Sequence, residues 1–331
     1  MKKTMLPDLP IPVSDWTSLA GLCTELQDLK RQQPAHYDRS ISSELFVESW
    51  ERLYAGKTVQ HTALIITAKA LLHILLPGCD AAFFTTAGLT AEDVHIILCR
   101  ALTNIAQERI HSDLFRELME ALPEISAEYA SGHRPTYTHL FDENEFRPEA
   151  WFVQVLCRQP RAGATAPGKP RLLLSPPEMH SDHCLMTAVY AVLFAGKYHS
   201  DAGQPWLAGL AHHLHNAVLP DCGFAGEILL NDWLDDIFSN SRERALASMP
   251  SALSDTVRSA LRYHETIDTP QGKSISTGDV IDRVLDVKWR TRAAAVQDQD
   301  ILGELELVHA GPLKDFQDDL LARTELWVPQ N

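Results

Sequence analysis

Side chains that could hold a metal ion gather in the second half of the chain. His183 stands near the start of an apolar stretch, the pair His212-His213 begins 29 positions later, and His264 and Asp282 come further along. Mixed imidazole and carboxylate ligands suit Mn, Fe, Co, Ni or Zn better than Ca or Mg. An ion held by such groups lowers the pKa of bound water and polarises a phosphoryl oxygen. These five residues are therefore the candidate metal ligands.

Amphipathic helices are predicted to position the first three histidines. Apolar residues recur every three or four positions after His183 and again around His212, which is the spacing of one helical face. The second helix is predicted to begin at Gly203 and to end at Pro220. On its helical period His212 points away from the apolar stripe and His213 flanks it, which suits lining a cavity better than filling a core. The stripes consist of Leu185, Val189, Val192 and Leu193 in the first helix and of Leu207, Leu210, Leu214 and Val218 in the second.

Later helices carry the remaining candidates. His264 lies at the end of an apolar face, where a histidine can equally be a buried core residue. The segment Ser276–Asp279 is predicted to cap a long helix, which places Asp282 in its first turns. A last helix is predicted around residues 313–321.

The order of these residues resembles the HD superfamily of metal-dependent phosphohydrolases. That family has a first His, a His-Asp dyad one helix-loop-helix later, optional further His residues and a last Asp. By this resemblance His183 is the first His, His212 the dyad His, His264 an accessory His and Asp282 the last Asp, while His213 stands where the dyad Asp belongs.

The resemblance covers about residues 178–290, and Ile281-Asp282-Arg283 is similar to the family's final Ala-Asp-Arg. It implies an HD-like helical bundle with a bound divalent transition metal. The implied activity is hydrolysis of a phosphoester such as a nucleotide.

The dyad itself departs from the family pattern, because it reads His-His. A carboxylate has two oxygens and can bridge two metal ions, whereas a neutral imidazole offers one lone pair. The change disfavours a dinuclear centre, including that of the di-iron oxygenases built on this fold. Three hypotheses stay open: a hydrolase with one ion, a non-catalytic HD-like binding or regulatory module, and an HD-fold iron oxygenase.

Two residues after the dyad occupy offsets that serve catalysis in the deoxynucleotidase branch of the family, where they are a Glu and an Asp. They are Asn216 and Asp221, four and nine positions after His212. Asn216 cannot act as a base, so the resemblance leaves it a role in substrate binding. Asp221 is the candidate base that activates water. The alternative interpretation of Asp221, which follows Pro220, is a turn residue.

One locally basic segment, residues 158–171, precedes the first helix of the candidate site. Its prolines and glycines predict a loop. Arg161, Lys169 and Arg171 could bind the phosphate of a substrate. An ordinary solvated linker is the alternative interpretation of the same charges.

The composition of the chain limits the kinds of molecule that it is expected to bind. Lys plus Arg is 29 and Asp plus Glu is 44 in 331 residues, and a net charge of −15 opposes binding to nucleic acid polymers or anionic membranes. The expected partner is a small-molecule phosphoester. The six cysteines form no CxxC pair and the N-terminus lacks an apolar signal region, which together predict reduced thiols in a cytoplasmic protein. The most apolar run, residues 63–76, is too short and too polar to cross a bilayer.

The whole chain is predicted to be all-α. Residues 1–145 are predicted as an N-terminal helical region of unknown role, and residues 146–331 as an HD-like metal-binding helical domain. Loop composition over residues 130–148 marks the boundary. In the first region Thr90–Asp93 resembles a capping box, and a helix containing Leu118 is predicted to stop near Pro123.

Overall fold

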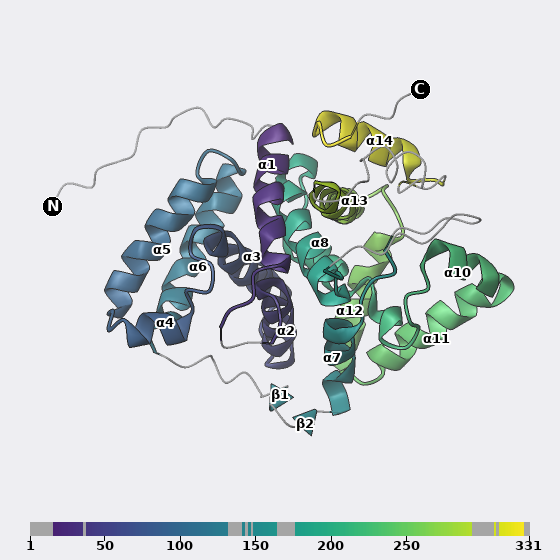
Figure 1. Ribbon diagram of the computed structural model, residues 1–331, viewed down its shortest axis with the longest axis horizontal. Coiled ribbons are helices and arrows are strands. Elements are labelled where there is room, and N and C mark those ends of the chain that lie inside the picture. The colour runs from purple at the N-terminus through teal and green to yellow at the C-terminus, as the bar shows by residue number, and fades with distance from the viewer. Residues whose placement is uncertain are drawn as a thin grey trace.

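The computed structural model describes residues 16–35, 38–131, 141–142, 145–146, 148–163, 176–292, 308 and 311–327 (Figure 1). These residues are almost entirely α-helical, which confirms the predicted all-α class. Apart from turns and loops, the exceptions among them are an antiparallel pair of two-residue strands, β1 (Phe141–Asp142) and β2 (Glu145–Phe146), and an isolated β-bridge between Pro160 and Met179.

The N-terminal part of the chain contributes a group of packed helices. They are α1 (Trp16–Leu26), the short 3-10 helix η1 (Gln27–Lys30), α2 (Ile41–Tyr54), α3 (Val59–Leu75), α4 (Ala81–Thr86), α5 (Ala91–Ala106) and α6 (Ser112–Ala130).

The C-terminal part contributes the helices that carry the candidate ligands. They are η2 (Pro148–Ala150), α7 (Trp151–Arg158), α8 (His180–Ala195), η3 (Gly196–Tyr198), α9 (Gly203–Ala211), η4 (Leu214–Ala217), α10 (Gly223–Leu230), η5 (Asn231–Trp233), α11 (Leu234–Leu246), α12 (Ser251–His264), α13 (Pro270–Thr291) and α14 (Lys314–Arg323).

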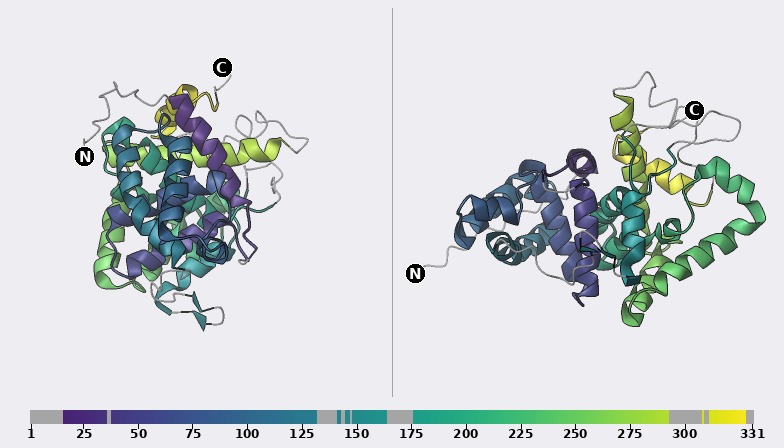
Figure 2. Two further views of the ribbon diagram at one scale, coloured as in Figure 1. Left: turned by 90° about the vertical axis from the view of Figure 1, so that its left-hand side faces the viewer. Right: turned by 60° about the horizontal axis from the view of Figure 1, so that its bottom comes forward.

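Helix α8 is the centre of the molecule. All 16 of its residues are buried. Helices α1, α2, α3, α7, α9 and α13 pack around it, so it is enclosed by elements from both parts of the chain. In Figure 1 and in the second view of Figure 2, α4 to α6 lie on one side of α8, and α10 and α11 lie on the other.

Two glycines allow α9 and α13 to approach α8 closely. A Cβ added at Gly209 would lie 2.8 Å from backbone atoms of Ala188, and a Cβ added at Gly278 would collide with the carbonyl oxygen of Thr187. Only a residue without a Cβ tolerates such contacts. The three helices that carry the candidate site therefore meet at backbone distance.

The N-terminal part also anchors the first turn of α8. One carboxylate oxygen of Asp182 accepts the backbone N–H of Met179 (3.2 Å), and the other accepts the hydroxyls of Ser40 (2.5 Å) and Ser42 (2.6 Å). Ser40 in turn caps α2 by accepting the N–H of Ser43 (3.0 Å). The first turns of α2 and α8 are thus joined through one buried carboxylate.

Helix boundaries in the first part confirm one prediction and correct another. The Thr90–Asp93 capping box is present. The helix predicted to stop near Pro123 instead continues through it to Ala130. Leu118 and Ile125, on either side of the proline, are both buried on one face. Burial along that face outweighs a proline penalty of roughly 3 kcal/mol.

Two boundaries near the candidate site also differ from prediction. Helix α13 begins at Pro270, where Thr269 accepts the N–H of Gly272 (2.9 Å), so the segment Ser276–Asp279 lies inside the helix and does not cap it. Threonine followed by proline is the stronger start signal. Helix α9 ends at Ala211 and does not reach Pro220, because the chain turns into η4 directly after the histidine pair.

One contiguous cluster of buried apolar side chains runs from Leu19 to Leu326. It includes residues on both sides of the predicted boundary at 145/146, so the N-terminal helices pack against the C-terminal ones as expected. The division into two domains stays a prediction. None of the described helices combines the length and apolarity needed to cross a bilayer. The six cysteines are free thiols.

Candidate metal centre

His183 has a polar contact at each ring nitrogen, at the buried start of α8. Its Nδ1 lies 2.6 Å from Oδ2 of Asp282, and its Nε2 lies 3.1 Å from Nε2 of His212. Burial alone would raise the pKa of Asp282, but the Lys30 ammonium and the contacts with His183 lower it overall. The carboxylate is therefore ionised and accepts the Nδ1 proton. In the tautomer that donates from Nδ1, the lone pair of the ring is at Nε2, as in many metal-binding histidines.

His212 is fixed in the same tautomer. It follows the last residue of α9, and its Nδ1 donates to the carbonyl oxygen of Gly209 (2.7 Å). Burial, followed by the neighbouring imidazoles of His183 and His264, holds its pKa well below the usual value. The ring is neutral, and its Nε2 lone pair faces Nε2 of His183.

Asp279 brings a carboxylate to these two nitrogens. Its Oδ1 lies 3.3 Å from Nε2 of His183 and 4.0 Å from Nε2 of His212. Burial raises the pKa of Asp279, but Arg283 and the contacts with His183 lower it well below the ordinary value. Two ligands at about 2.1 Å from a tetrahedral ion stand roughly 3.4 Å apart. The three atoms have separations on either side of this value, so these groups could hold a divalent ion.

The sequence pattern does not reveal Asp279, because Ser-Thr-Gly-Asp is typical of a helix start. A signal was available in the spacing. Asp279 and Asp282 are three positions apart and therefore share a helical face. Once α13 is known to begin at Pro270, both carboxylates face α8.

Asp282 lies behind His183, on its Nδ1 side. Its Oδ1 accepts the amide N–H of Gln27 (2.7 Å), and its Oδ2 accepts from Lys30 Nζ (2.8 Å) as well as from His183. Glu178, His183 and Asp282 also have ligand atoms within 4.8 Å of one another. The Lys30 ammonium, however, already binds Glu178 (2.5 Å) as well as Asp282. Asp282, a predicted metal ligand, thus binds Lys30 and orients His183.

His213 stands beside both central histidines. Its ring centroid is 4.2 Å from that of His212 and 5.1 Å from that of His183, and all three rings have ligand nitrogens within 4.8 Å of one another. The Nδ1 of His213 lies 2.6 Å from Oδ1 of Asn216, whose amide donates to the carbonyl oxygen of Leu219 (3.2 Å). Asn216, predicted to bind substrate, therefore orients His213.

Three more histidines surround this group. His264 lies 5.2 Å from His212 between ring centroids, and His180 and His215 lie 4.9 Å and 5.4 Å from His213. Neither ring nitrogen of His180 has a hydrogen-bond partner among the described residues. Burial is the main cause that lowers the pKa of all three, that of His215 to about 4. These three rings, like those of His212 and His213, are therefore uncharged near neutral pH, which is the state that metal binding requires.

Asp221, the predicted base, lies at the edge of the cluster. Its two oxygens accept the backbone N–H groups of Ala162 (2.9 Å) and Gly223 (2.9 Å). It is 3.7 Å from Nε2 of His180. The contacts match the alternative interpretation of Asp221 as a turn residue. They do not prevent a further contact to a water molecule, since each oxygen has a second lone pair.

The predicted phosphate-binding residues have different outcomes. Arg161 is paired with Glu178 (3.3 Å), while Lys169 and Arg171 lie outside the described residues. A cation that the sequence pattern did not assign lies closer to the centre. Arg283, one turn after Asp279 on α13, has a guanidinium nitrogen 3.5 Å from Oδ2 of Asp279 and is one-fifth exposed.

Comparison of the chain with models of known protein families, with curated proteins and with solved structures finds no match.

Proposed function

We propose that this protein is a metal-dependent hydrolase of the HD type that acts on a small phosphoester such as a nucleotide. One observation supports this most: Nε2 of His183, Nε2 of His212 and Oδ1 of Asp279 converge within 4.0 Å. Two of these residues are the first His and the dyad His of the resemblance. We assign the carboxylate ligand to Asp279 and a positioning role to Asp282.

The contacts behind the ligands support the same assignment. Asp282 and the carbonyl oxygen of Gly209 accept hydrogen bonds from the Nδ1 atoms of His183 and His212, which makes Nε2 of both rings the candidate ligand atoms. Partners of this kind typically change metal affinity by roughly 10- to 100-fold. His213, oriented by Asn216, is the candidate fourth ligand. The N-terminal part of the chain contributes Lys30, which keeps Asp282 ionised.

A bound divalent ion would supply Lewis-acid polarisation of the phosphoryl group and a water of lowered pKa. Substrate would approach from the side of Asp279 and His213, whose side chains are partly exposed. Arg283 would bind a non-bridging phosphate oxygen there, and charge-assisted bonds from arginine to phosphate are strong. Asp221 stays the candidate base, at the edge of the histidine cluster.

The test compares two aspartates on α13. A four-ligand zinc site binds with roughly 10 to 16 kcal/mol, so loss of one ligand costs roughly 3 kcal/mol, or at least 100-fold in affinity. Asp279→Asn should lose that much affinity for Zn or Mn and lose nucleotidase activity. Asp282→Asn should lose less, roughly 10- to 100-fold. The exposed Asp255→Asn on α12 is the matched control and should change neither property.

Other outcomes would redirect the assignment. A larger loss of metal in Asp282→Asn than in Asp279→Asn would return the ligand role to Asp282. Absence of bound metal under every condition would leave the non-catalytic binding module as the better hypothesis.

An iron oxygenase is the second candidate, and one observation favours it. Two histidines and one carboxylate with open positions are the ligand set of non-haem Fe(II) oxygenases. In this chain the set would hold one iron, because the dyad lacks the bridging carboxylate. Iron in the purified protein, oxygen uptake with reductant and no phosphatase activity on a nucleotide panel would decide for it.

A further inference from the structure

Two groups of possible metal ligands among the described residues share His183. One group joins it to His212 and His213, and the other joins it to Glu178 and Asp282; in each group the ligand atoms lie within 4.8 Å of one another. His212 contacts Nε2 of His183, whereas Asp282 contacts Nδ1. A neutral imidazole has one lone pair, so His183 can serve only one ion at a time. The two groups therefore compete for the same histidine.

The ammonium of Lys30 already stands in the second group. Its Nζ lies 2.5 Å from Oε1 of Glu178 and 2.7 Å and 2.8 Å from the two oxygens of Asp282. All three side chains are buried, with 3% of Lys30, 8% of Glu178 and none of Asp282 exposed. A divalent ion bound by these carboxylates would need the same oxygens. Lys30 thus occupies the place that an ion in this group would take.

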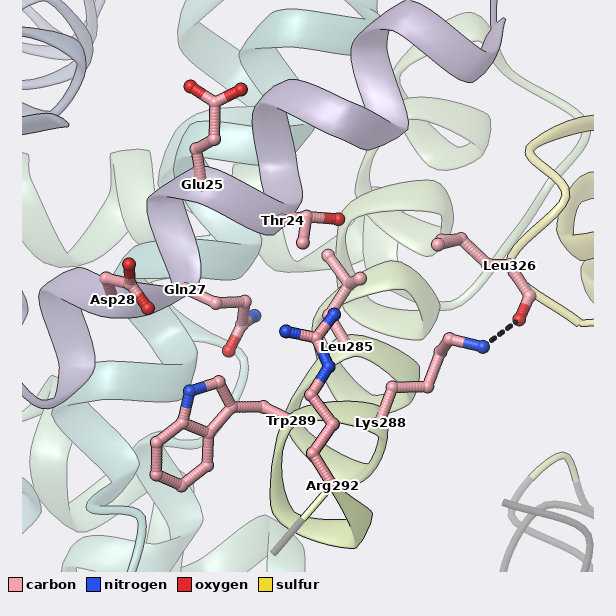
Figure 3. A pocket seen from close by; sticks show the side chains of 9 residues that line it. All are labelled: Thr24, Glu25, Gln27, Asp28, Leu285, Lys288, Trp289, Arg292 and Leu326. Carbon is pink, nitrogen blue, oxygen red and sulfur yellow. Dashed lines mark hydrogen bonds between the residues drawn. The ribbon is translucent and has the colours of Figure 1, made fainter. Parts of the chain in front are cut away.

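The packing of η1 on α13 holds the ammonium there. In Figure 3 the side chain of Gln27 extends from η1 toward α13, where its Nε2 donates to Oδ1 of Asp282 (2.7 Å) and to the hydroxyl of Tyr190 (3.1 Å). Lys30 follows three positions later in the same short helix and reaches the same carboxylate. The position of the cation is therefore set by contacts between the two parts of the chain.

The charges of the second group balance only when Lys30 is present. Glu178 also pairs with Arg161 (3.3 Å), so two carboxylates face two cations. Without Lys30 the two carboxylates would face one cation and would attract a divalent ion. Carboxylate oxygens suit Mn²⁺ or Mg²⁺, whereas imidazole suits Zn²⁺. The two groups therefore differ in the metal that they would select.

We propose that the ammonium of Lys30 excludes a divalent ion from Glu178 and Asp282 and so directs the ion to Nε2 of His183. Lys30 is a positioning residue in this assignment, because it touches neither the ion nor a substrate. The direction of the ion to Nε2 rests on the proposed function. The exclusion itself does not, because it concerns only the contacts between Lys30 and the two carboxylates.

Lys30→Ala and Lys30→Met together separate exclusion of an ion from loss of stability. Alanine removes the ammonium and three methylene groups, which leaves more room than the roughly 30 Å³ share of one water molecule. Methionine also removes the charge, but its side chain fills most of this space. Lys30→Ala should bind Mn²⁺ at least about tenfold more tightly than the parent, whereas Lys30→Met should show no gain. Lys314→Ala, at a surface ion pair on α14, is a further control and should bind like the parent.

Titrations that follow the EPR signal of free Mn²⁺ measure these affinities, and competition with Zn²⁺ measures the preference between the metals. The gain in Lys30→Ala should disappear when Glu178→Gln is added, and its preference should shift from Zn²⁺ toward Mn²⁺. In the parent, Glu178→Gln should leave the affinity for Zn²⁺ unchanged. If Lys30→Ala is unfolded without metal, millimolar Mn²⁺ should refold it, because an ion that binds only the native state stabilises that state.

Four results would overturn the proposal: equal Mn²⁺ affinity in Lys30→Ala and the parent, a gain that survives Glu178→Gln, an equal gain in Lys30→Met, or a Lys30→Ala chain that stays unfolded in Mn²⁺. A purely structural role of Lys30 predicts that both variants lose stability and that neither gains Mn²⁺. A parent that binds no metal would refute the proposed hydrolase instead, and Lys30→Ala should still gain Mn²⁺ in that case.

Discussion

Lys30 is the residue through which the N-terminal part reaches the candidate centre, and replacing it by methionine should be strongly destabilising. The side chain is 3% exposed, and its ammonium lies 2.5 Å from Glu178 and 2.8 Å from Asp282, both buried. Methionine keeps a similar length and apolar stem but removes the charge. Two buried carboxylates then face each other without this cation. Removing one partner of a buried ion pair costs about 3 to 5 kcal/mol. The contacts that remain, from Arg161 to Glu178 and from Gln27 and His183 to Asp282, favour the lower end.

The loss should depend on pH in a defined direction. In the parent, burial raises the pKa values of Asp282 and Glu178, but Lys30 and further cations lower them overall. Carboxyls with a lowered folded-state pKa add stability above their unfolded value, roughly pH 4, and lose it as pH falls through the folded pKa. Without Lys30 the burial effect is less opposed, so both pKa values rise. On acidification the folded variant therefore takes up protons that neutralise the two buried carboxylates. The difference in unfolding free energy between parent and variant should then shrink from pH 7 to pH 5.

Urea unfolding of parent and variant at pH 7, 6 and 5 measures both quantities. Lys314→Met is the matched control, because Lys314 forms a surface pair with Asp318 (3.0 Å) on α14 and such pairs contribute about 0 to 1 kcal/mol. A loss below about 1 kcal/mol for Lys30→Met, or a difference from the parent that stays constant with pH, would refute the reasoning about the buried cation.

The other predictions concern the metal and the contacts that hold its ligands. Chelation should lower the Tm and readdition restore it, since an ion that binds only the native state stabilises it by mass action; a protein that loses its metal and melts unchanged would contradict the site. Gly278→Ala should cost about 1 to 3 kcal/mol and weaken metal binding, because the added methyl group forces α13 away from α8. Gly311→Ala, where an added Cβ meets nothing within 4 Å, is its control. His213→Ala should bind less metal, and Asn216→Ala should show a smaller loss of the same kind; stoichiometry and affinity equal to the parent in His213→Ala would remove it from the ligands.

The sequence predicted the helices well wherever one apolar face recurs. The histidines at 183, 212, 213 and 264 were expected to converge, and they do. His183 lies in the first turns of α8 and His264 at the end of α12, while His212 and His213 lie in the turn directly after α9. The choice between Asp279 and Asp282 could not be predicted. Both lie on one face of α13, and only the position of the helix start and its close contact with α8 decide which carboxylate reaches Nε2 of His183.

Contacts between distant segments were the other limit. Lys30 and Asp282 are 252 positions apart, and no local pattern links a lysine in the first helices to the last aspartate of the resemblance. The same holds for Ser40 and Ser42, which donate hydrogen bonds to Asp182 from a distant part of the sequence. These polar contacts form only after the N-terminal helices have packed on α8.

The burial of every residue in α8 has a consequence for how the sequence can change over time. A surface helix usually has an exposed face on which substitutions accumulate at little cost, but α8 has none. Core positions sense even a single methylene group, so compensating changes would have to arise in the surrounding helices. In any set of relatives α8 should therefore drift most slowly, from the buried His180 at its first turn to Ala195 at its last, while the exposed faces of α5, α11 and α14 diverge freely around it.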